Sequence, residues 1–354
     1  MKRIEKLVVV GGGTAGWLTA GRIAAYHQVK RNPDLEVILV ESPDVPIVGV
    51  GEGTWPTMRS TLAALGISET EFIRECQATF KQGAKFAGWK TGRPEDFYYH
   101  PLVLPVGFGK SDLTPYWQST GKDFSSSVCF QQSLCEQHRA PKTLQTPEFE
   151  GIANYAYHLD AGSFARLLQK HCVDRLGVKH LYANVLDVEF NAAGFINGLV
   201  IDGGRQLSGD LFVDCTGSKA LLIGQHLNAK QTSCSDVLFG DRATVIQVPY
   251  SDGQTEIASQ TIGSALPAGW VWDIGLQNRR GVGYVWSSQY TSEEQAVNQF
   301  DQYLAQQGDD YSLSSVRTLK LANSYRKTPW VKNCIAVGLS AGFIEPLEAS
   351  SLVY

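Results

Sequence analysis

Three glycines near the amino terminus have the spacing of a dinucleotide-binding turn. The segment GGGTAG places Gly11, Gly13 and Gly16 in a Gly-x-Gly-x-x-Gly pattern, and Glu41 follows at the end of the next apolar run. Such glycines permit a tight turn and close approach to a pyrophosphate, while an acidic residue near position 41 suits a ribose hydroxyl. The pattern predicts an FAD or NAD site and disfavours NADP, whose additional phosphate the carboxylate would repel. A glycine-rich turn in an unrelated sheet is the alternative.

Two tryptophans, two lysines and a histidine are further side chains that could take part in a reaction. They are Trp270 and Trp272, Lys81 and Lys85, and His100. Two residues apart in a strand, the tryptophans would share one face, as core residues commonly do. Four residues apart in a segment expected to be helical, the lysines would also share a face, and surface lysines are usually solvated. Residue types alone therefore leave these candidates open.

The elements around the glycines predict a nucleotide-binding sheet. A short apolar run at residues 6–10, a helix after the glycines and a second run at residues 36–41 form a strand, helix, strand unit with a parallel pair. We expect a loop from 43 to 56, two helices between 57 and 90, and an irregular insertion from 91 to 150. A helix begins near Phe164, and the strands of residues 180–216 form an antiparallel excursion that returns to the sheet.

Composition favours a globular protein that handles a small molecule. The 354 residues suggest two domains, or one large domain with an insertion. The 43% hydrophobic and 19% charged residues exclude disordered and fibrous classes. A net charge of -4 gives no electrostatic reason to bind nucleic acid or anionic membranes. The seven cysteines form no Cys-x-x-Cys pair and predict reduced thiols, with no metal site. Without an apolar run of membrane-spanning length or a cleavable leader, the expected location is the cytoplasm.

Five segments together resemble the flavin-dependent tryptophan halogenase family. They are GGGTAGW from Gly11, VGVGEGTWP from Val48, TFKQGAKFAGW from Thr79, GWVWDIGLQNRRGVGYVWS from Gly269 and GFIEPLEASS from Gly342. YHLDAGSFARLL and DLFVDCTG extend the likeness along the whole chain. The resemblance implies an α/β fold with an FAD-binding Rossmann-like, doubly wound sheet of the glutathione reductase and hydroxybenzoate hydroxylase type, with an inserted mixed-sheet substrate region.

The resemblance also implies a division of the chain. Residues 1–56, 151–225 and 326–354 would form a discontinuous FAD-binding module, and residues 57–150 and 226–325 the substrate or cap region. The family continues beyond the position of Tyr354, so its C-terminal helical part is expected to be absent here.

The resemblance assigns roles to particular residues. Lys81 would hold hypohalous acid made from reduced FAD, oxygen and chloride or bromide, and Glu348 would be the catalytic carboxylate, with Lys85 and Glu345 as their rivals. His100, Trp270, Trp272, Ser350 and Ser351 would form the substrate and halide site. The residues expected to bind FAD are Gly11, Gly13, Thr14, Ala15, Gly16, Glu41, Gly49, Val50, Gly51, Glu52, Gly338 and Ser340.

Two departures from the family pattern bear on function. Gly275 replaces the proline of the Trp-x-Trp-x-Ile-Pro motif, and Ser350 and Ser351 replace a threonine and a glycine. The expected activity is halogenation of an electron-rich aromatic, an indole or tryptophan, with reduced FAD from a separate NAD(P)H-dependent reductase; a homodimer is compatible with the resemblance. A flavin-dependent aromatic monooxygenase and a non-catalytic flavin-binding remnant are the alternatives.

Overall fold

A six-stranded sheet forms one half of the molecule and carries the glycine-rich turn. A computed structural model of the chain describes residues 3–46, 51–93, 95–250, 256–308, 311–312, 315–345 and 347. The strand order of this sheet is β20 (Trp330–Val331), β21 (Cys334–Ala336), β12 (Leu211–Asp214), β1 (Lys6–Val10), β2 (Glu36–Glu41) and β8 (Lys179–Tyr182). All neighbours are parallel except β20 and β21. The predicted parallel strand, helix, strand opening is therefore confirmed.

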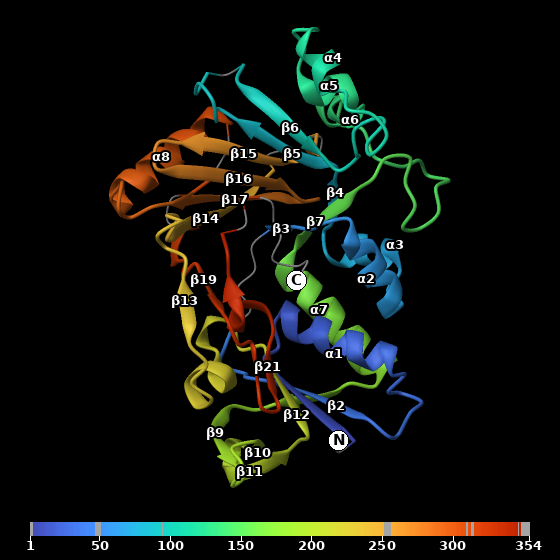
Figure 1. The fold of residues 1–354 in the computed structure, drawn as a ribbon, viewed down its shortest axis with the longest axis vertical. Coiled ribbons are helices and arrows are strands. Elements are labelled where there is room, and N and C mark those ends of the chain that lie inside the picture. Colours follow the sequence, from blue (N-terminus) through green and yellow to red (C-terminus); the bar gives the residue numbers. More distant parts are fainter. Residues whose placement is uncertain are drawn as a thin grey trace.

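Helices cover one face of this sheet and close its core. They are α1 (Thr14–Tyr26), α2 (Thr57–Leu65), α3 (Glu69–Glu75) and α7 (Ala161–His171). In Figure 1, α1 and α7 lie alongside one another over the lower sheet. The apolar runs of β1 and β2 are buried, as expected for parallel strands covered on both faces. Trp17 of α1 and Phe164 of α7 share one core with Leu39 of β2.

A three-stranded excursion leaves and re-enters the parallel sheet. The antiparallel strands are β11 (Arg205–Ser208), β10 (Ile196–Ile201) and β9 (Val185–Phe190), and the chain then returns as β12. This confirms the antiparallel excursion predicted from the turn residues. A second small antiparallel sheet contains β13 (Gln231–Ser233), β19 (Ser324–Arg326) and β22 (Gly342–Phe343).

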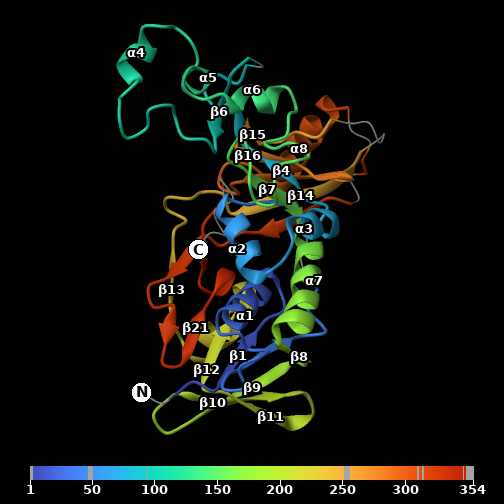
Figure 2. The same cartoon turned by 90° about the vertical axis from the view of Figure 1, so that its right-hand side faces the viewer.

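A seven-stranded sheet forms the other half of the molecule (Figure 1). Its order is β18 (Arg317–Lys320), β14 (Arg242–Pro249), β17 (Arg279–Trp286), β16 (Gly269–Gly275), β15 (Thr261–Leu266), β5 (Gly83–Ala87) and β6 (Phe97–Pro101). Helix α8 (Glu293–Gln306) packs on one face, where Phe300 shares a core with Val271 and Tyr284. The insertion carries three short helices, α4 (Thr114–Gln118), α5 (Phe124–Val128) and α6 (Gln131–Glu136). Figure 2 shows α4 and its loops projecting beyond the sheet.

A short antiparallel sheet connects the two halves and corrects one prediction. It contains β3 (Gly51–Gly53), β7 (Ala156–Asp160) and β4 (Thr79–Lys81). The helix expected to continue to residue 90 is wrong, because α3 ends at Glu75 and Thr79 to Lys81 pair with β7 instead. A short apolar stretch fits both periodicities, and pairing with a buried central strand decides between them.

The seven cysteines are all unpaired thiols. Six are buried, and Cys234 is half-buried.

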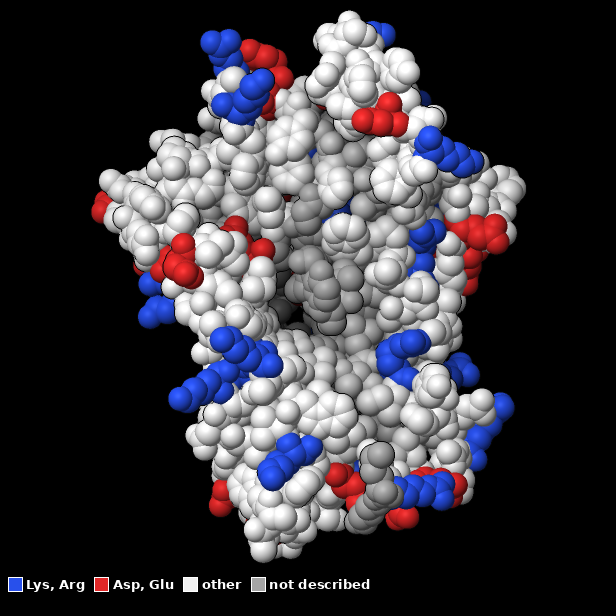
Figure 3. All heavy atoms as spheres, in the orientation of Figure 1, with Lys and Arg blue, Asp and Glu red and all other residues white. Residues whose placement is uncertain are grey.

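Charges of both signs are scattered over the face shown in Figure 3, which is hollowed near its middle. None of the helices in the described ranges is long and apolar enough to span a membrane.

Candidate functional site

The glycine-rich turn lies at the carboxyl end of β1, and its glycines meet different demands. A Cβ on Gly16 would lie 1.8 Å from the Gly11 carbonyl oxygen, and one on Gly11 would lie 2.2 Å from the Cys215 oxygen. A Cβ on Gly13 would meet nothing within 4 Å. Close packing therefore requires Gly11 and Gly16, whereas Gly13 borders open space where α1 begins. A helix N-terminus beside open space is a favourable place for a pyrophosphate.

A second turn adjoins the start of α1. A Cβ on Gly338 would lie 2.8 Å from the Ala15 Cβ, so the turn at Gly338–Ser340 lies against the first turn that Thr14 opens. Ser340 is buried, and its hydroxyl donates to carbonyl oxygens of Asp214 and Val337. These bonds give the Ser340 hydroxyl a structural role, so any contact with a ligand falls to the backbone of the turn.

Glu41 ends β2 beside the glycine-rich turn. A Cβ on Gly12 would lie 2.2 Å from the Glu41 Cδ, which places the carboxylate over the turn. His180 Nε2 lies 2.9 Å from Glu41 Oε2, and Gln169 Nε2 lies 3.2 Å from His180 Nδ1. Both the Nε2 and the Oε2 atom are buried, and neither makes a hydrogen bond of good geometry, so His180 and Glu41 form a close polar contact beside the turn. The sequence motif identified Glu41 but not His180, which lies in β8, far from Glu41 in sequence but next to β2 in the sheet.

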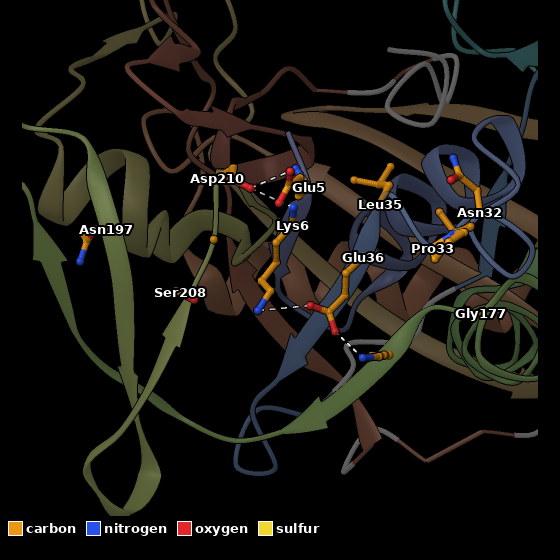
Figure 4. A pocket seen from close by; sticks show the side chains of 13 residues that line it. Glu5, Lys6, Asn32, Pro33, Leu35, Glu36, Gly177, Asn197, Ser208 and Asp210 are labelled. Carbon is orange, nitrogen blue, oxygen red and sulfur yellow. Dashed lines mark hydrogen bonds and ion pairs between the residues drawn. The ribbon is translucent and has the colours of Figure 1, made fainter. Parts of the chain in front are cut away.

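A pocket lies at the opposite edge of this sheet. Its volume is about 640 Å³, and it lies at the amino ends of β1 and β2 (Figure 4). Glu36 pairs there with Lys6 and Lys179, and Asp210 accepts backbone N–H bonds from Glu5 and Lys6. In open α/β sheets ligands bind at the carboxyl ends of the strands. The paired charges of this pocket hold the sheet edge together.

Lys81 is buried in the connecting sheet and faces the seven-stranded sheet. The residue is 3% exposed, and in β4 it pairs with Ala156 of β7. Its neighbour Phe80 points the other way, to the ring of Tyr155 in the helical core. Thr79, on the same face as Lys81, donates to the Gly275 carbonyl at 2.6 Å.

Lys85 does not share a helical face with Lys81. It lies in β5, paired with Tyr99 of β6, and its Nζ is 4.3 Å from the centre of the Phe97 ring. The two lysines therefore belong to different sheets. The prediction that they share a helix face is wrong for the reason given above, the pairing of β4 with β7.

His158 is a buried group that lies next to Lys81 and was not singled out from the sequence. It pairs with Thr79 and Gly53 in the register of the connecting sheet, so its side chain shares the face of Lys81. Its Nε2 lies 2.8 Å from the Thr261 hydroxyl, and its Nδ1 has no hydrogen-bond partner. Burial, and then the charge of Lys81, hold the pKa of His158 well below its usual value. His158 is therefore an uncharged imidazole beside the lysine.

The two tryptophans lie on the face of the seven-stranded sheet that meets the connecting sheet. Trp272 and Trp270 alternate with Val271, which faces α8, and their rings are 6.2 Å apart. Opposite Trp272, a Cβ on Gly283 would lie 2.2 Å from the indole. Gly281, two residues away on this face, packs against Gly51 of β3. The expectation that the tryptophans share a face is confirmed.

Crowding explains the glycine that replaces the family proline. A Cβ on Gly275 would lie 2.8 Å from Ile257 Cγ2 and 3.1 Å from the Tyr250 hydroxyl. Gly275 also pairs with Arg280 in the β16 and β17 ladder. A proline ring at this position would clash with these neighbours, and proline has no backbone N–H group to donate.

Of the remaining site residues predicted from the sequence, some lie within the described ranges and five lie outside them. His100 is exposed on β6, with its ring 6.4 Å from that of Trp55. Burial, and then the charge of Asp160, raise the pKa of Glu52 to about 7. Glu345, the rival carboxylate, is bonded by the Trp270 indole, and burial raises its pKa. Five predicted residues lie outside the described ranges: Gly49, Val50, Glu348, Ser350 and Ser351. The described residues contain no cluster of metal-binding side chains.

Comparison with known proteins identifies the family. The family model described as tryptophan halogenase matches residues 6–354. A crystal structure of a tryptophan halogenase from Shewanella frigidimarina is 46% identical with a TM-score of 0.93, covering 99% of this chain and 69% of that one. The tryptophan 6-halogenase SttH from Streptomyces toxytricini is 34% identical, with the same coverage and a TM-score of 0.89.

A third solved structure carries the flavin dependence in its name. Xcc4156, a flavin-dependent halogenase from Xanthomonas campestris, is 33% identical with a TM-score of 0.87, covering 99% of this chain and 69% of that one. The Rossmann-like α/β fold predicted from the sequence is thereby confirmed, as is the predicted enzyme class. The chain belongs to the tryptophan halogenase family of flavin-dependent enzymes.

Proposed function

We propose that this enzyme uses reduced FAD, oxygen and chloride or bromide to halogenate an electron-rich aromatic, an indole or tryptophan, through Lys81. The observation that carries the proposal is the burial of Lys81 on the face of β4 that looks toward Trp270 and Trp272. Bound reduced flavin, with oxygen and halide, would supply hypohalous acid and water. The reaction then exchanges one ring hydrogen for halogen and forms a second water.

The environment of Lys81 suits the capture of a reactive reagent. A buried amine can hold hypohalous acid by a hydrogen bond, or as a haloamine, and so convert a diffusing oxidant into a positioned one. An uncharged His158 adds no positive charge to the site, so it is compatible with Lys81 as an ammonium or as an amine. Glu348 is proposed to accept the proton that the ring loses, and the amides of Ser350 and Ser351 to bind halide.

The glycine-rich turn fits the pyrophosphate of FAD. Open space beside Gly13, the free amides expected at the start of α1 and the carboxylate of Glu41 provide the anion site and the ribose contact. We extend this proposal to the backbone of Thr14, Ala15 and Gly338, and to the segment Gly49 to Glu52.

The wider assembly is also part of the proposal. We propose a separate NAD(P)H-dependent reductase as the source of reduced flavin, because the sequence has one dinucleotide motif. We also propose the discontinuous FAD module and the homodimer. Strands β1, β2, β8, β12 and β21 fall within the proposed module, which supports the division.

The test is a Lys81→Met variant, because methionine keeps the packing of the buried stem and removes the amine. With chemically reduced FAD, oxygen, bromide and an indole, the variant should still oxidise flavin at the parental rate. The yield of brominated indole, read by mass spectrometry, should fall at least about a thousandfold, since the positioned reagent is lost.

Lys85→Met is the matched control, because Lys85 lies in a different sheet and contacts Phe97. It should brominate as the parent does. Parental bromination by Lys81→Met would refute the role of Lys81. A hydroxylated indole from the parent protein would instead identify a monooxygenase, and flavin binding without any product a non-catalytic remnant.

A further inference from the structure

Two distant sequence motifs meet in one hydrogen bond. The indole Nε1–H of Trp270, in the middle of the seven-stranded sheet, donates to Oε1 of Glu345, which begins the EPLE segment. Trp270 is 6% exposed, and its backbone is fixed by ladders to Ala265 on one side and Val285 on the other. The donor therefore has little freedom to move. An indole N–H can only donate, so a carboxylate is a well-matched partner for it.

A second hydrogen bond holds the backbone of Glu345. Its backbone N–H donates to Asn323 Oδ1 at 2.8 Å, and Asn323 Nδ2 donates in turn to the Gly240 carbonyl at 2.7 Å. A Cβ on Gly240 would lie 2.8 Å from Glu345 Oε2, so glycine provides the room for this carboxylate. Asn323 is buried. Glu345 is thus bonded through both its side chain and its backbone, and its carboxylate packs closely against Gly240.

The two tryptophans have different contacts. The Trp272 ring fills the space above Gly283, and the structure describes no hydrogen bond from its indole. The Trp270 ring lies beside it, but its N–H points to Glu345. A role as aromatic bulk suits Trp272, whereas the polar end of Trp270 has a specific partner.

We propose that Trp270 is a positioning residue, whose N–H clamps Glu345 and so fixes the start of the segment that carries the proposed catalytic carboxylate and halide site. Glu348 follows Glu345 by three residues, and Ser350 by five. A segment anchored at its first residue loses fewer conformations when it binds a halide. This inference rests on the function proposed above, because it assigns the segment its halide.

The clamp can be tested without turnover. In the ¹H–¹⁵N spectrum of the full chain, Trp270→Phe assigns one of the indole N–H signals. That signal should lie downfield in the parent, as expected for a charge-assisted bond, move upfield in Glu345→Ala, and be largely restored in Glu345→Gln, which keeps an acceptor oxygen. A Trp270 signal that does not respond to Glu345→Ala would overturn the clamp.

The effect on the halide site is read by chloride binding and by turnover. The ³⁵Cl line width of chloride solutions reports binding directly. Trp270→Phe keeps an aromatic ring, so FAD affinity should be unchanged while the chloride dissociation constant and the halide KM rise about tenfold. The double variant Trp270→Phe, Glu345→Ala should be no worse than either single one, whereas Trp272→Phe and Glu345→Ala should combine additively.

The outcomes separate this inference from the proposed function. Parental chloride binding and halide KM in Trp270→Phe would refute the positioning role, even if the NMR signal confirms the bond. Chloride that binds the parent and is weakened by Trp270→Phe would support it, even if no indole is halogenated and the proposed function fails. A parent that binds no chloride would overturn the inference, because there would be no halide site to position.

Discussion

Replacing Gly13 by aspartate should change stability and cofactor binding in opposite directions. Gly13 is the N-cap of α1, with φ -76° and ψ -179°, and it makes no side-chain cap bond. Aspartate adopts this conformation readily and would accept from the amides of Ala15 or Gly16. Its cap bond and its favourable charge should stabilise the flavin-free protein by about 0.5 kcal/mol, which raises the Tm by roughly 1 °C.

The same carboxylate should exclude FAD. It would occupy the amides that the pyrophosphate needs, and its negative charge would repel those of the pyrophosphate. We therefore expect the Kd for FAD to rise at least about a hundredfold, which is a loss of about 2.7 kcal/mol of binding free energy. The assay is a titration followed by quenching of flavin fluorescence, with thermal unfolding of the flavin-free protein measured by circular dichroism.

Two further variants act as controls for this prediction. Gly13→Asn caps without charge and should weaken FAD binding less than aspartate does. Gly16→Ala places a Cβ 1.8 Å from the Gly11 carbonyl and should lower the stability of the flavin-free protein by about 1 to 3 kcal/mol. If Gly13→Asp binds FAD within threefold of the parent, the pyrophosphate does not approach this turn and the reasoning is wrong. A destabilised flavin-free Gly13→Asp would show that the space beside Gly13 is not open.

Three other variants test further parts of the structure. His180→Phe keeps an aromatic ring but loses the polar contact with Glu41, so the Kd for FAD should rise about tenfold. The double variant His180→Phe, Glu41→Gln should bind FAD no more weakly than Glu41→Gln alone, and additive effects in a fluorescence titration would contradict this. The pKa of Glu52 is about 7 in the folded protein and has its ordinary value of 4.5 in the unfolded chain, so the parent loses stability as the pH rises between these values. The excess stability of Glu52→Gln in denaturant titrations should therefore grow from pH 5 to pH 8, reaching roughly 2 to 3 kcal/mol; a constant difference would contradict the raised pKa. Glu69→Ala removes the partner of Lys142 and of two buried tyrosine hydroxyls, and should cost about 3 to 5 kcal/mol in the same titrations, whereas a loss under 1 kcal/mol would show that the network contributes little.

Local chemistry made the nucleotide-binding half predictable. The glycines, the buried run of β1 and the acidic end of β2 depend on neighbours in sequence, and the strand, helix, strand order with its parallel pair followed from them. Even so, spacing alone did not distinguish Gly13 from Gly16. That difference lies in the carbonyl of Gly11 and in the open space beside α1, which are properties of the folded turn.

Long-range pairing accounts for what sequence reasoning missed. Thr79 to Lys81 are a strand because β7, some 75 residues later, offers them an edge, and no local pattern reports this. His158 becomes a neighbour of Lys81 through the same pairing, and His180 reaches Glu41 across adjacent parallel strands. Contacts between motifs, such as Trp270 with Glu345, likewise require the folded sheet.

The unpaired thiols acquire a particular meaning beside the proposed reagent. Hypohalous acid attacks thiolates faster than it halogenates rings, so an enzyme that makes it must survive its own product. Burial raises the pKa of Cys135, Cys172 and Cys215 to about 12, which keeps these sulfurs in the less reactive protonated form. Cys234 is the one thiol that is not buried, so it is where self-inflicted oxidation should begin. The packing that buries the other six sulfurs should therefore also slow their oxidation by the product that the enzyme is proposed to make.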